Sequence, residues 1–376
     1  MPKGAQNRGR MDSLKQELKR KDQLIRCCIS IFKEGKPWFR CFRKFRAPKN
    51  TARSFVHCMV ENNDSHSTRV RITGRSKESG QTLQWITRPA SPTLAVVTTV
   101  LEVIDGGTSY LEKKGVNEAR LNMQRLVGHF LGFTRVQLYL EFDRPLTEEQ
   151  LIPIREALKK RGQGVPLQHI IGEVEFMTRD FKCDARALIP RPETEELVSL
   201  VLKEKESLTQ PTRILDVGTG SGVIGISLAC ELPSVGEVVL SDLSPEALSL
   251  AKENAESLEQ EVSLVESDLF SSISGQFELI LANLPYVPEN DREGLEPELK
   301  HDPDLALFSG PDGMDLIKKF TTEVGDYLKP GGLLAMEVGH DQGQITADLL
   351  SQHAFTDIEV KKDLNEIPRF PFARKS

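Results

Sequence analysis

The chain is poor in cysteine and lacks long apolar runs. Six cysteines occur in 376 residues, Cys27 and Cys28 are adjacent, and no Cys-x-x-Cys is present. Because these spacings match no usual zinc site, we expect no metal centre and a reduced, cytoplasmic setting. No apolar stretch reaches the roughly 18 residues that a membrane-spanning helix requires. The partly apolar run from Leu24 to Phe32 contains Arg26 and no small-residue cleavage site, which argues against a secretory signal.

Acidic residues are scarce at one end of the sequence. Residues 1–90 hold 21 Lys and Arg against 7 Asp and Glu, a net charge of +14, whereas the remaining residues carry a net charge of −20. Charges interrupt every apolar cluster in residues 1–90, which predicts a mostly disordered basic extension. Three interpretations of this extension stay open: a basic arm that holds RNA or the ribosome by its phosphates, an organelle transit peptide, or a dispensable segment.

Helical periodicity follows the basic extension. Between residues 91 and 164, apolar residues such as Val97, Val100, Leu101 and Ile104 recur at helical spacing. Thr147-Glu148-Glu149-Gln150 has the pattern of a capping box. This segment predicts a small helical domain, which at about 75 residues is too small to hold a sizeable cofactor alone. Short β-like runs in residues 165–192 predict a connecting β-hairpin.

From residue 193 the pattern becomes an alternation of strands and helices. Strands are expected at Arg213–Val217, Glu237–Ser241, Glu261–Val265, Phe277–Ala282 and Leu333–Val338, with helices at 222–231, 245–258, 313–327 and 342–352. The alternation predicts that residues 193–376 form a doubly wound, Rossmann-like α/β domain. Ligands are expected beyond the carboxyl ends of its strands.

A glycine-rich turn lies between the first of these strands and its helix. Its residues are Gly218, Thr219, Gly220, Ser221 and Gly222. Glycines let a backbone approach a ligand closely, although they also serve tight turns. The third glycine of a dinucleotide fingerprint is missing, since Val223 stands there. No Lys or Arg lies between Asp216 and Glu231, which disfavours a pyrophosphate ligand and fits the sulfonium cation of S-adenosylmethionine.

Two acidic residues follow the next two strands. Asp242 ends the second strand, where an acid can accept both ribose hydroxyls. Asp268 follows the third strand, where it can meet an adenine amino group. The alternative roles are a helix cap for Asp242 and a surface turn for Asp268. Their order along one α/β pattern favours a nucleoside site.

The segment Asn283-Leu284-Pro285-Tyr286 comes directly after a buried apolar strand. Asn283 Oδ1 and the carbonyl oxygen of Leu284 can accept the two hydrogens of a planar NH2 group. Pro285 stiffens the turn, and Tyr286 can pack over the amide. The same residues could form only a turn. Together with the glycine-rich turn, they indicate methyl transfer to an amide or amino nitrogen, catalysed mainly by positioning.

At this point the chain resembles the peptide chain release factor glutamine methyltransferases. The resemblance covers roughly residues 92–376 and rests on four segments: 166–176 (PLQHIIGEVEF), 189–195 (IPRPETE), 216–222 (DVGTGSG) and 283–286 (NLPY). The segment 189–195 is the specific one, since DNA adenine methyltransferases share a motif like 283–286 but lack it. The resemblance implies N5-methylation of the glutamine in the Gly-Gly-Gln loop of release factors, with the helical domain helping to dock that protein.

The resemblance also suggests site residues and two departures. Phe176 could line the glutamine channel or belong to the core. Glu193 could approach the sulfonium or its amino group, and Arg191 belongs to the same segment. The family usually has Pro where Leu284 stands, which should leave the backbone carbonyl in place. Some members carry Trp where Leu269 stands, so aromatic stacking on the adenine is not expected here, although a Leu can still pack on its face.

Three other functions remain open from the sequence. The closest is methylation of a ribosomal protein glutamine. The second is methylation of an adenine or cytosine amino group in nucleic acid, with residues 1–90 as the grip, but the net charge of −20 over the remaining chain disfavours it. The third is a binding module without catalysis.

Overall fold

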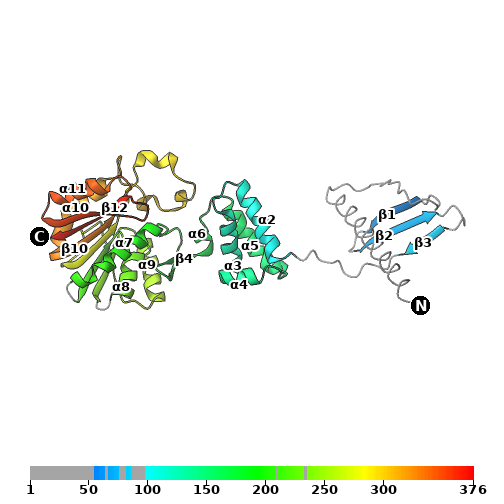
Figure 1. The fold of residues 1–376 in the computed structure, drawn as a ribbon, viewed down its shortest axis with the longest axis horizontal. Coiled ribbons are helices and arrows are strands. Elements are labelled where there is room, and N and C mark those ends of the chain that lie inside the picture. Colours follow the sequence, from blue (N-terminus) through cyan, green and yellow to red (C-terminus); the bar gives the residue numbers. More distant parts are fainter. Residues whose placement is uncertain (1–54, 64–66, 76–81, 87–97, 209–210, 233–234) are drawn as a thin grey trace, which may run out of the picture. The chain divides into compact units, whose positions relative to one another are not determined.

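The computed structural model describes residues 55–63, 67–75, 82–86, 98–208, 211–232 and 235–376. The chain divides into two compact units, Met1–Val96 and Val97–Ser376. In the first unit, an antiparallel sheet has the order β1 (Phe55–Asn63), β2 (Ser67–Arg75), β3 (Thr82–Ile86) (Figure 1).

These three strands lie within residues 1–90, for which the sequence predicts mostly disordered chain. In β2, Thr68, Val70 and Ile72 alternate with arginines and a threonine, and such alternation is typical of a strand. The structure differs from the prediction at these strands. The prediction took account of the charges that interrupt the apolar clusters, but not of the regular alternation of residue types. The rest of residues 1–90 lies outside the described residues, so the prediction of disorder there stays a prediction.

A small helical domain opens the described part of the second unit. Its helices are α2 (Val100–Lys113), α3 (Ala119–Leu131), α4 (Arg135–Leu140) and α5 (Glu148–Arg161). Thr99, Thr134 and Thr147 form capping boxes with Glu102, Gln137 and Gln150. Each box satisfies backbone N–H groups that the first helical turn leaves free. The domain encloses its own core, which includes the fully buried Ile104, Leu111, Met123, Leu126 and Ile154.

A short connector joins the helical domain to the α/β domain. It consists of α6 (Leu167–Ile171) and a hairpin of β4 (Glu173–Phe176) and β5 (Arg179–Lys182). The run His169 to Glu173, which looks β-like in the sequence, is mostly the helix α6. Pro166 precedes this helix and Gly172 ends it with a left-handed backbone, which is where proline and glycine favour helix ends.

A mostly parallel seven-stranded sheet forms the α/β domain. Its strand order is β11-β12-β10-β9-β6-β7-β8. The bounds are β6 (Thr212–Val217), β7 (Val235–Asp242), β8 (Ser263–Glu266), β9 (Phe277–Asn283), β10 (Leu328–Glu337), β11 (Phe355–Lys362) and β12 (Pro368–Lys375). β12 runs antiparallel to both of its neighbours. The chain builds outward from β6 to β8 and then returns to β9 on the other side, so the strand order reverses between β6 and β9, where ligands are expected.

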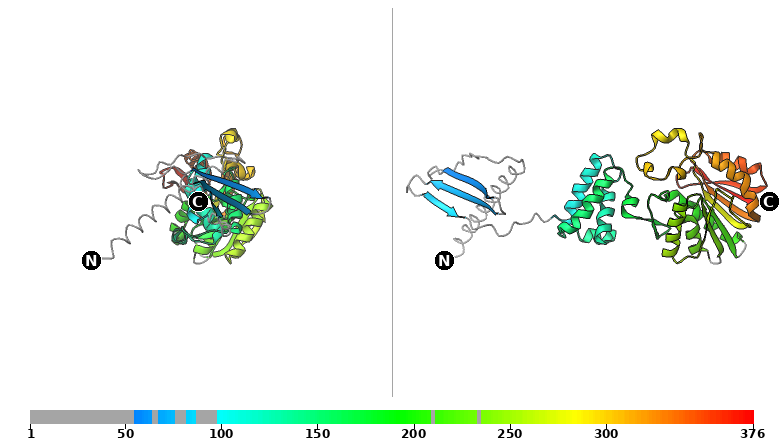
Figure 2. Two further views of the ribbon diagram at one scale, coloured as in Figure 1. Left: turned by 90° about the vertical axis from the view of Figure 1, so that its right-hand side faces the viewer. Right: turned by 180° about the vertical axis from the view of Figure 1, so that it is seen from behind.

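Helices cover both faces of this sheet (Figures 1 and 2). One face packs against α7 (Pro192–Lys203), α8 (Val223–Glu231) and α9 (Pro245–Ser257), and the other against α10 (Asp315–Tyr327) and α11 (Gly343–Ser351). In β9, Leu279 and Leu281 face the first set, whereas Ile280 and Ala282 face the second. Burial on both faces explains the unbroken apolar run of this strand. The predicted doubly wound domain, preceded by a helical domain, is confirmed.

We expect Phe320→Ala to destabilise the α/β domain by about 3–5 kcal/mol. Phe320 is fully buried on α10, and its ring lies 5.3 Å from that of Phe270 between centroids, so truncation leaves a cavity. The measurement is urea unfolding followed by circular dichroism. Leu364→Ala serves as the control, because Leu364 is 86% exposed and its loss should change the free energy of unfolding by less than about 0.5 kcal/mol. Equal effects of the two variants would contradict the packing described.

Candidate active site

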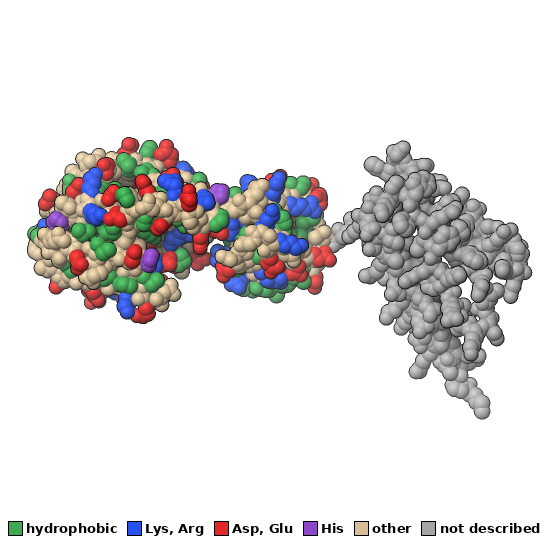
Figure 3. All heavy atoms as spheres, turned by 90° about the horizontal axis from the view of Figure 1, so that it is seen from above, with side chains coloured by type: hydrophobic (Ala, Val, Ile, Leu, Met, Phe, Trp, Pro, Cys, Tyr) green, Lys and Arg blue, Asp and Glu red, His purple; other side chains and the backbone are tan. Residues whose placement is uncertain are grey.

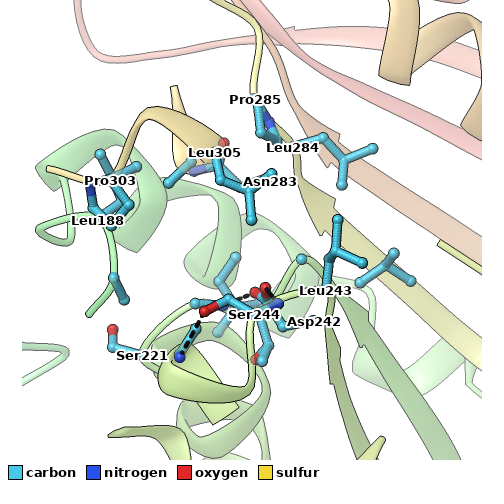
Figure 4. A pocket seen from close by; sticks show the side chains of 18 of the residues that line it. Leu188, Ser221, Asp242, Leu243, Ser244, Asn283, Leu284, Pro285, Pro303 and Leu305 are labelled. Atoms are coloured by element: carbon cyan, nitrogen blue, oxygen red, sulfur yellow. Dashed lines mark hydrogen bonds between the residues drawn. The ribbon is translucent and has the colours of Figure 1, made fainter. Parts of the chain in front are cut away.

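A pocket lies at the carboxyl ends of β6, β7 and β9, where the strand order reverses. One side of it is formed by Pro303, Leu305 and Ala306, from the long connection between β9 and α10. Figure 4 shows Asn283, Pro303 and Leu305 on one side of the cavity and Ser221, Asp242 and Ser244 on the opposite side. The other lining residues used below are Arg186, Arg191, Thr194, Gly218, Thr219, Gly220, Leu243, Asp268, Leu269, Leu284, Pro285 and Leu316.

Hydrogen bonds to Ser241 and Asp216 fix the conformation of the glycine-rich turn between β6 and α8. The N–H groups of Gly218 and Thr219 both donate to the carbonyl oxygen of Ser241, at 2.9 Å. Asp216 is fully buried, and its Oδ2 accepts from the Thr219 hydroxyl at 2.6 Å and from the Gly225 N–H at 3.0 Å. Burial raises the pKa of Asp216 to about 6. Asp216 therefore shapes the turn from beneath it.

Four of the five predicted residues of this turn line the pocket, and Gly222 does not. Gly222 caps α8 with φ +84°, and a Cβ there would lie 2.6 Å from Ile226 Cδ1 and 3.1 Å from Ala251 Cβ. Its missing side chain lets α8 and α9 pack closely. The close contacts at Gly222 therefore give it a packing role, although Val223 and Ile224 after it line the pocket again, and a direct part of Gly222 in cofactor binding stays a prediction.

Asp242 lines the pocket at the end of β7. Its Oδ2 accepts from the Gly220 N–H and its Oδ1 from the Ser244 N–H, both at 2.9 Å. Burial raises the pKa of this carboxyl group, and the backbone hydrogen bonds oppose the shift. Each carboxylate oxygen keeps a second lone pair, so the group can orient the glycine-rich turn and still accept from a ligand. The alternative of a helix cap does not describe it, since the Ser244 hydroxyl caps α9.

Asp268 and Leu269 lie together at the rim of the pocket. The Asp268 carboxylate forms an ion pair with Lys319 of α10, at 3.0 Å, and its side chain is 53% exposed. Leu269 is buried, has φ +50°, and packs in the hydrophobic core on the face of the sheet that α10 and α11 cover. The Leu269 side chain thus offers an apolar wall. A contact of Asp268 with an adenine stays a prediction, and it would compete with Lys319.

Asn283 ends β9, and its amide is oriented by a buried neighbour. The Nδ2 group donates to Thr194 Oγ1 at 3.2 Å, and Thr194 Oγ1 donates to Glu337 Oε2 at 2.7 Å. Because Nδ2 is engaged in this way, Oδ1 is the end of the amide left to accept a hydrogen bond from a ligand. Thr194 lies in the first turn of α7, after the N-cap residue Arg191 and Pro192, and its hydroxyl is used in these two contacts and not as a helix cap.

A second pocket meets the first at Asn283. Both are lined by Leu188, Arg191, Asn283, Leu284 and Ala306. The second pocket adds the charged side chains of Glu193, Glu296 and Arg369, together with Tyr286. Burial raises the pKa of Tyr286 to about 12, so its hydroxyl stays protonated. Two cavities that share one asparagine suit a reaction between two bound molecules.

Leu284 and Pro285 complete the predicted motif. The Leu284 side chain is 3% exposed, and a Cβ on Gly218 would lie 3.0 Å from its Cδ2. Leu284 is thus anchored in the core and against the glycine-rich turn, which fixes the backbone that follows Asn283. Pro285 lines the first pocket. The carbonyl oxygen of Tyr286 accepts from Gln342 Nε2 at 3.0 Å, which holds the other end of the motif.

Phe176 lies in neither pocket. It is 1% exposed, and its ring packs edge-on against that of Phe181, with 6.0 Å between centroids. It belongs to the core beneath α7 and α8. The suggested role in a glutamine channel is therefore corrected to a core role. The hairpin of β4 and β5 turns this side chain inward, where burial of an aromatic ring stabilises the connector.

Sequence reasoning missed the long connection between β9 and α10. It joins Asn283 to Asp315 through short 3-10 turns and contributes Pro303, Leu305 and Ala306 to the first pocket. Arg191 Nη2 lies 3.4 Å from the buried Asp302, and Arg161 of α5 pairs with Glu298. The length of this connection was the available signal, since loops beyond about 15 residues are commonly functional.

Among the residues that the structure describes, no group of three or more His, Cys, Asp or Glu side chains is placed to hold a metal ion. None of the described helices has both the length and the apolar character needed to cross a membrane.

Comparison with known proteins places these features in a family. Residues 102–172 match the PrmC N-terminal domain, and residues 194–296 match the methyltransferase small domain. Release factor glutamine methyltransferases from Deinococcus radiodurans and Geobacter sulfurreducens are 39% and 38% identical to this chain. The alignments cover 73% and 72% of this chain and 98% and 95% of those relatives. A relative from Chlorobaculum tepidum with the same name is 36% identical over 73% of this chain and 96% of its own length. The chain therefore belongs to the release factor glutamine methyltransferase family.

Proposed function

We propose that this protein transfers a methyl group from S-adenosylmethionine to the side-chain amide nitrogen of the glutamine in the Gly-Gly-Gln motif of peptide chain release factors. The observation that carries the proposal is Asn283, which lies where two pockets meet and whose Nδ2 is engaged by Thr194. The exposed end of its amide is then a hydrogen-bond acceptor, as recognition of an NH2 group requires.

The first pocket fits S-adenosylmethionine, which supplies an electrophilic methyl group when bound. Asp242 offers carboxylate lone pairs for ribose hydroxyls, and Leu243, Leu269 and Leu316 offer apolar walls for a base. Arg186 is paired with Asp184 and Glu253, and Arg191 with Asp302. Because the two arginines are neutralised, the lining does not repel a sulfonium cation.

The second pocket is proposed to admit the glutamine side chain. A carboxamide nitrogen is a poor nucleophile, so its orientation matters most. Asn283 Oδ1 accepts one of its hydrogens and the Leu284 carbonyl oxygen the other, which directs the nitrogen toward the first pocket. Tyr286 packs beside the amide plane. The proton leaves after methyl transfer, so the chain needs no general base before that step.

We expect Asp242→Asn to weaken binding of S-adenosylhomocysteine on the order of 10- to 100-fold, as loss of hydrogen bonds to a charged group implies. In the asparagine variant, the side-chain NH2 group would face the N–H of Gly220 or Ser244, so that two donors meet. The amide would also be a weaker acceptor for the ribose hydroxyls. Isothermal titration calorimetry gives the dissociation constants. Asp105→Asn, an exposed change on α2, is the control. Unchanged affinity in Asp242→Asn would remove Asp242 from the proposed cofactor site.

Nucleic acid as a substrate receives less support. On the face in Figure 3, acidic and basic side chains are interspersed over the described residues of the helical and α/β domains. A protein that grips a duplex usually carries a basic stripe. Nucleic-acid binding through the basic residues 1–90 stays a proposal of its own, compatible with a protein substrate. A cytoplasmic location is part of this proposal, because release factors act in translation there.

A methyl-transfer assay with labelled S-adenosylmethionine tests the substrate class. It compares a purified release factor, a ribosomal protein fraction and DNA. Label on the release factor alone is the expected result. Label on the ribosomal fraction or on DNA, with none on the factor, would leave the chemistry in place and overturn the proposed substrate.

A further inference from the structure

A short series of hydrogen-bonded side chains lies beneath the site, between Asn283 and the end of β10. Glu337 is the last residue of β10 and pairs in register with Asn283 of β9. The side chain of Thr194, on the first turn of α7, lies between them. Glu337 and Thr194 are 1% and 3% exposed; the proposed function uses the contact of Thr194 with Asn283 but gives Glu337 no role.

The direction of these hydrogen bonds follows from the donors and acceptors available. An ionised carboxylate can only accept, so Thr194 donates its one hydrogen to Glu337, at 2.7 Å. The Thr194 oxygen then accepts from Asn283 Nδ2, at 3.2 Å. The NH2 end of the Asn283 amide is thereby turned away from the pockets. Without this chain, an asparagine amide could turn over and present its NH2 group to the substrate.

We propose that Thr194 and Glu337 are positioning residues that fix the polarity of the Asn283 amide, so that Oδ1 faces the substrate nitrogen. The inference rests on the proposed function, since it concerns the same reaction. If the Asn283 amide were reversed, two NH2 groups would face each other and the substrate nitrogen would lose one of its two acceptors. Glu337 thus acts on the Asn283 amide, both through Thr194 and by its own side-chain interaction with Asn283, and it touches neither reactant.

The negative charge on Glu337 decides which groups donate and which accept in these hydrogen bonds. Burial raises the pKa of Glu337 to about 7, against the opposing effects of Thr194, Arg369 and Asn283. Arg369 of β12, Glu193 of α7 and Tyr286 are the charged or titratable groups that act on it. A protonated Glu337 can donate to Thr194, which frees the Thr194 hydrogen for Asn283 Oδ1 and reverses the amide. Methyl transfer should therefore slow as the pH falls through about 7.

The test measures kcat, KM for the release factor and the dissociation constant of S-adenosylhomocysteine in four variants. Thr194→Val keeps the shape but removes the hydroxyl, and kcat should fall on the order of 10- to 100-fold, as expected for a mispositioned group. KM and the dissociation constant should stay within about twofold. Thr194→Ser should regain most of the lost kcat. Thr321→Val, which removes a buried hydroxyl bonded to Lys318 on α10, is the matched control.

The fourth variant, Glu337→Gln, removes the titrating group. Its kcat should be lower than that of the wild type and should lose the rise between pH 6 and pH 8 (bracketing the pKa of about 7). A wild-type kcat in Thr194→Val, or an unchanged pH profile in Glu337→Gln, would overturn the inference. If Thr194→Val does not fold, the pH profile of Glu337→Gln decides alone. Failure of the wild type to methylate any release factor would instead be a failure of the proposed function.

Discussion

Asn283→Ala should lower kcat for methyl transfer on the order of 10³-fold, the loss typical when a preorganised group at the reacting centre is removed. Asn283 lines both pockets and offers the one side-chain acceptor assigned to the substrate nitrogen. Its loss leaves the glutamine amide free to rotate, so that few bound complexes have the nitrogen lone pair aimed at the methyl group. Initial rates at saturating release factor and cofactor give kcat.

The expected loss is confined to the chemical step. Binding of S-adenosylhomocysteine should weaken by no more than about threefold, since ribose and base contacts lie elsewhere in the pocket. Circular dichroism should show an unchanged fold. A kcat within about tenfold of the wild type would contradict the assignment of Asn283 as the group that orients the substrate.

Gly313→Ala should also disrupt the reaction, from outside both pockets. Gly313 has φ +74°, and a Cβ there would lie 2.2 Å from the carbonyl oxygen of Tyr286 and 3.0 Å from Gln342 Nε2. These two groups are hydrogen-bonded to each other at 3.0 Å. Backbone atoms must move to relieve such a contact, so Tyr286 and the second pocket should shift. We expect kcat/KM for the release factor to fall on the order of 100-fold, the effect of a displacement near 1 Å.

Gly331→Ala provides a matched control for Gly313→Ala. Gly331 has φ +75°, yet a Cβ there would meet nothing within 4 Å. Both variants carry the cost of a left-handed alanine, about 1–2 kcal/mol of stability, but only Gly313→Ala adds the clash. Thermal unfolding and steady-state rates of the two variants separate strain from displacement. Equal activities of the two variants would show that the reaction does not depend on the observed position of the Tyr286 backbone.

The parallel strands could be predicted from the sequence because burial on both faces leaves continuous apolar runs. The expected strand Phe277–Ala282 and the observed Phe277–Asn283 differ by one residue. β11 and β12 could not be predicted in this way. β12 contains Pro368 and Pro371, and prolines argue against a strand. Its place between β10 and β11 is a tertiary pairing that local sequence does not record.

The site residues that could be predicted from the sequence are those at the carboxyl end of a parallel strand. Gly218, Asp242 and Asn283 each follow or end a parallel strand, and the sheet brings such ends together. Contacts that depend on packing were not predictable. Thr194 and Glu337 are 143 residues apart in the sequence and meet only because α7 packs over β10. The sequence left Phe176 open between a channel wall and the core for the same reason, since a shared motif does not show what a side chain packs against.

The most direct test of the central claim is mass spectrometry of a release factor incubated with this protein and S-adenosylmethionine. The factor is digested, and the peptide that contains the Gly-Gly-Gln motif is fragmented. We expect one added methyl group on the glutamine side chain, absent with Asn283→Ala and absent when that glutamine is replaced by alanine. A methyl group on any other residue, or none on the factor while another substrate is labelled, would contradict the account.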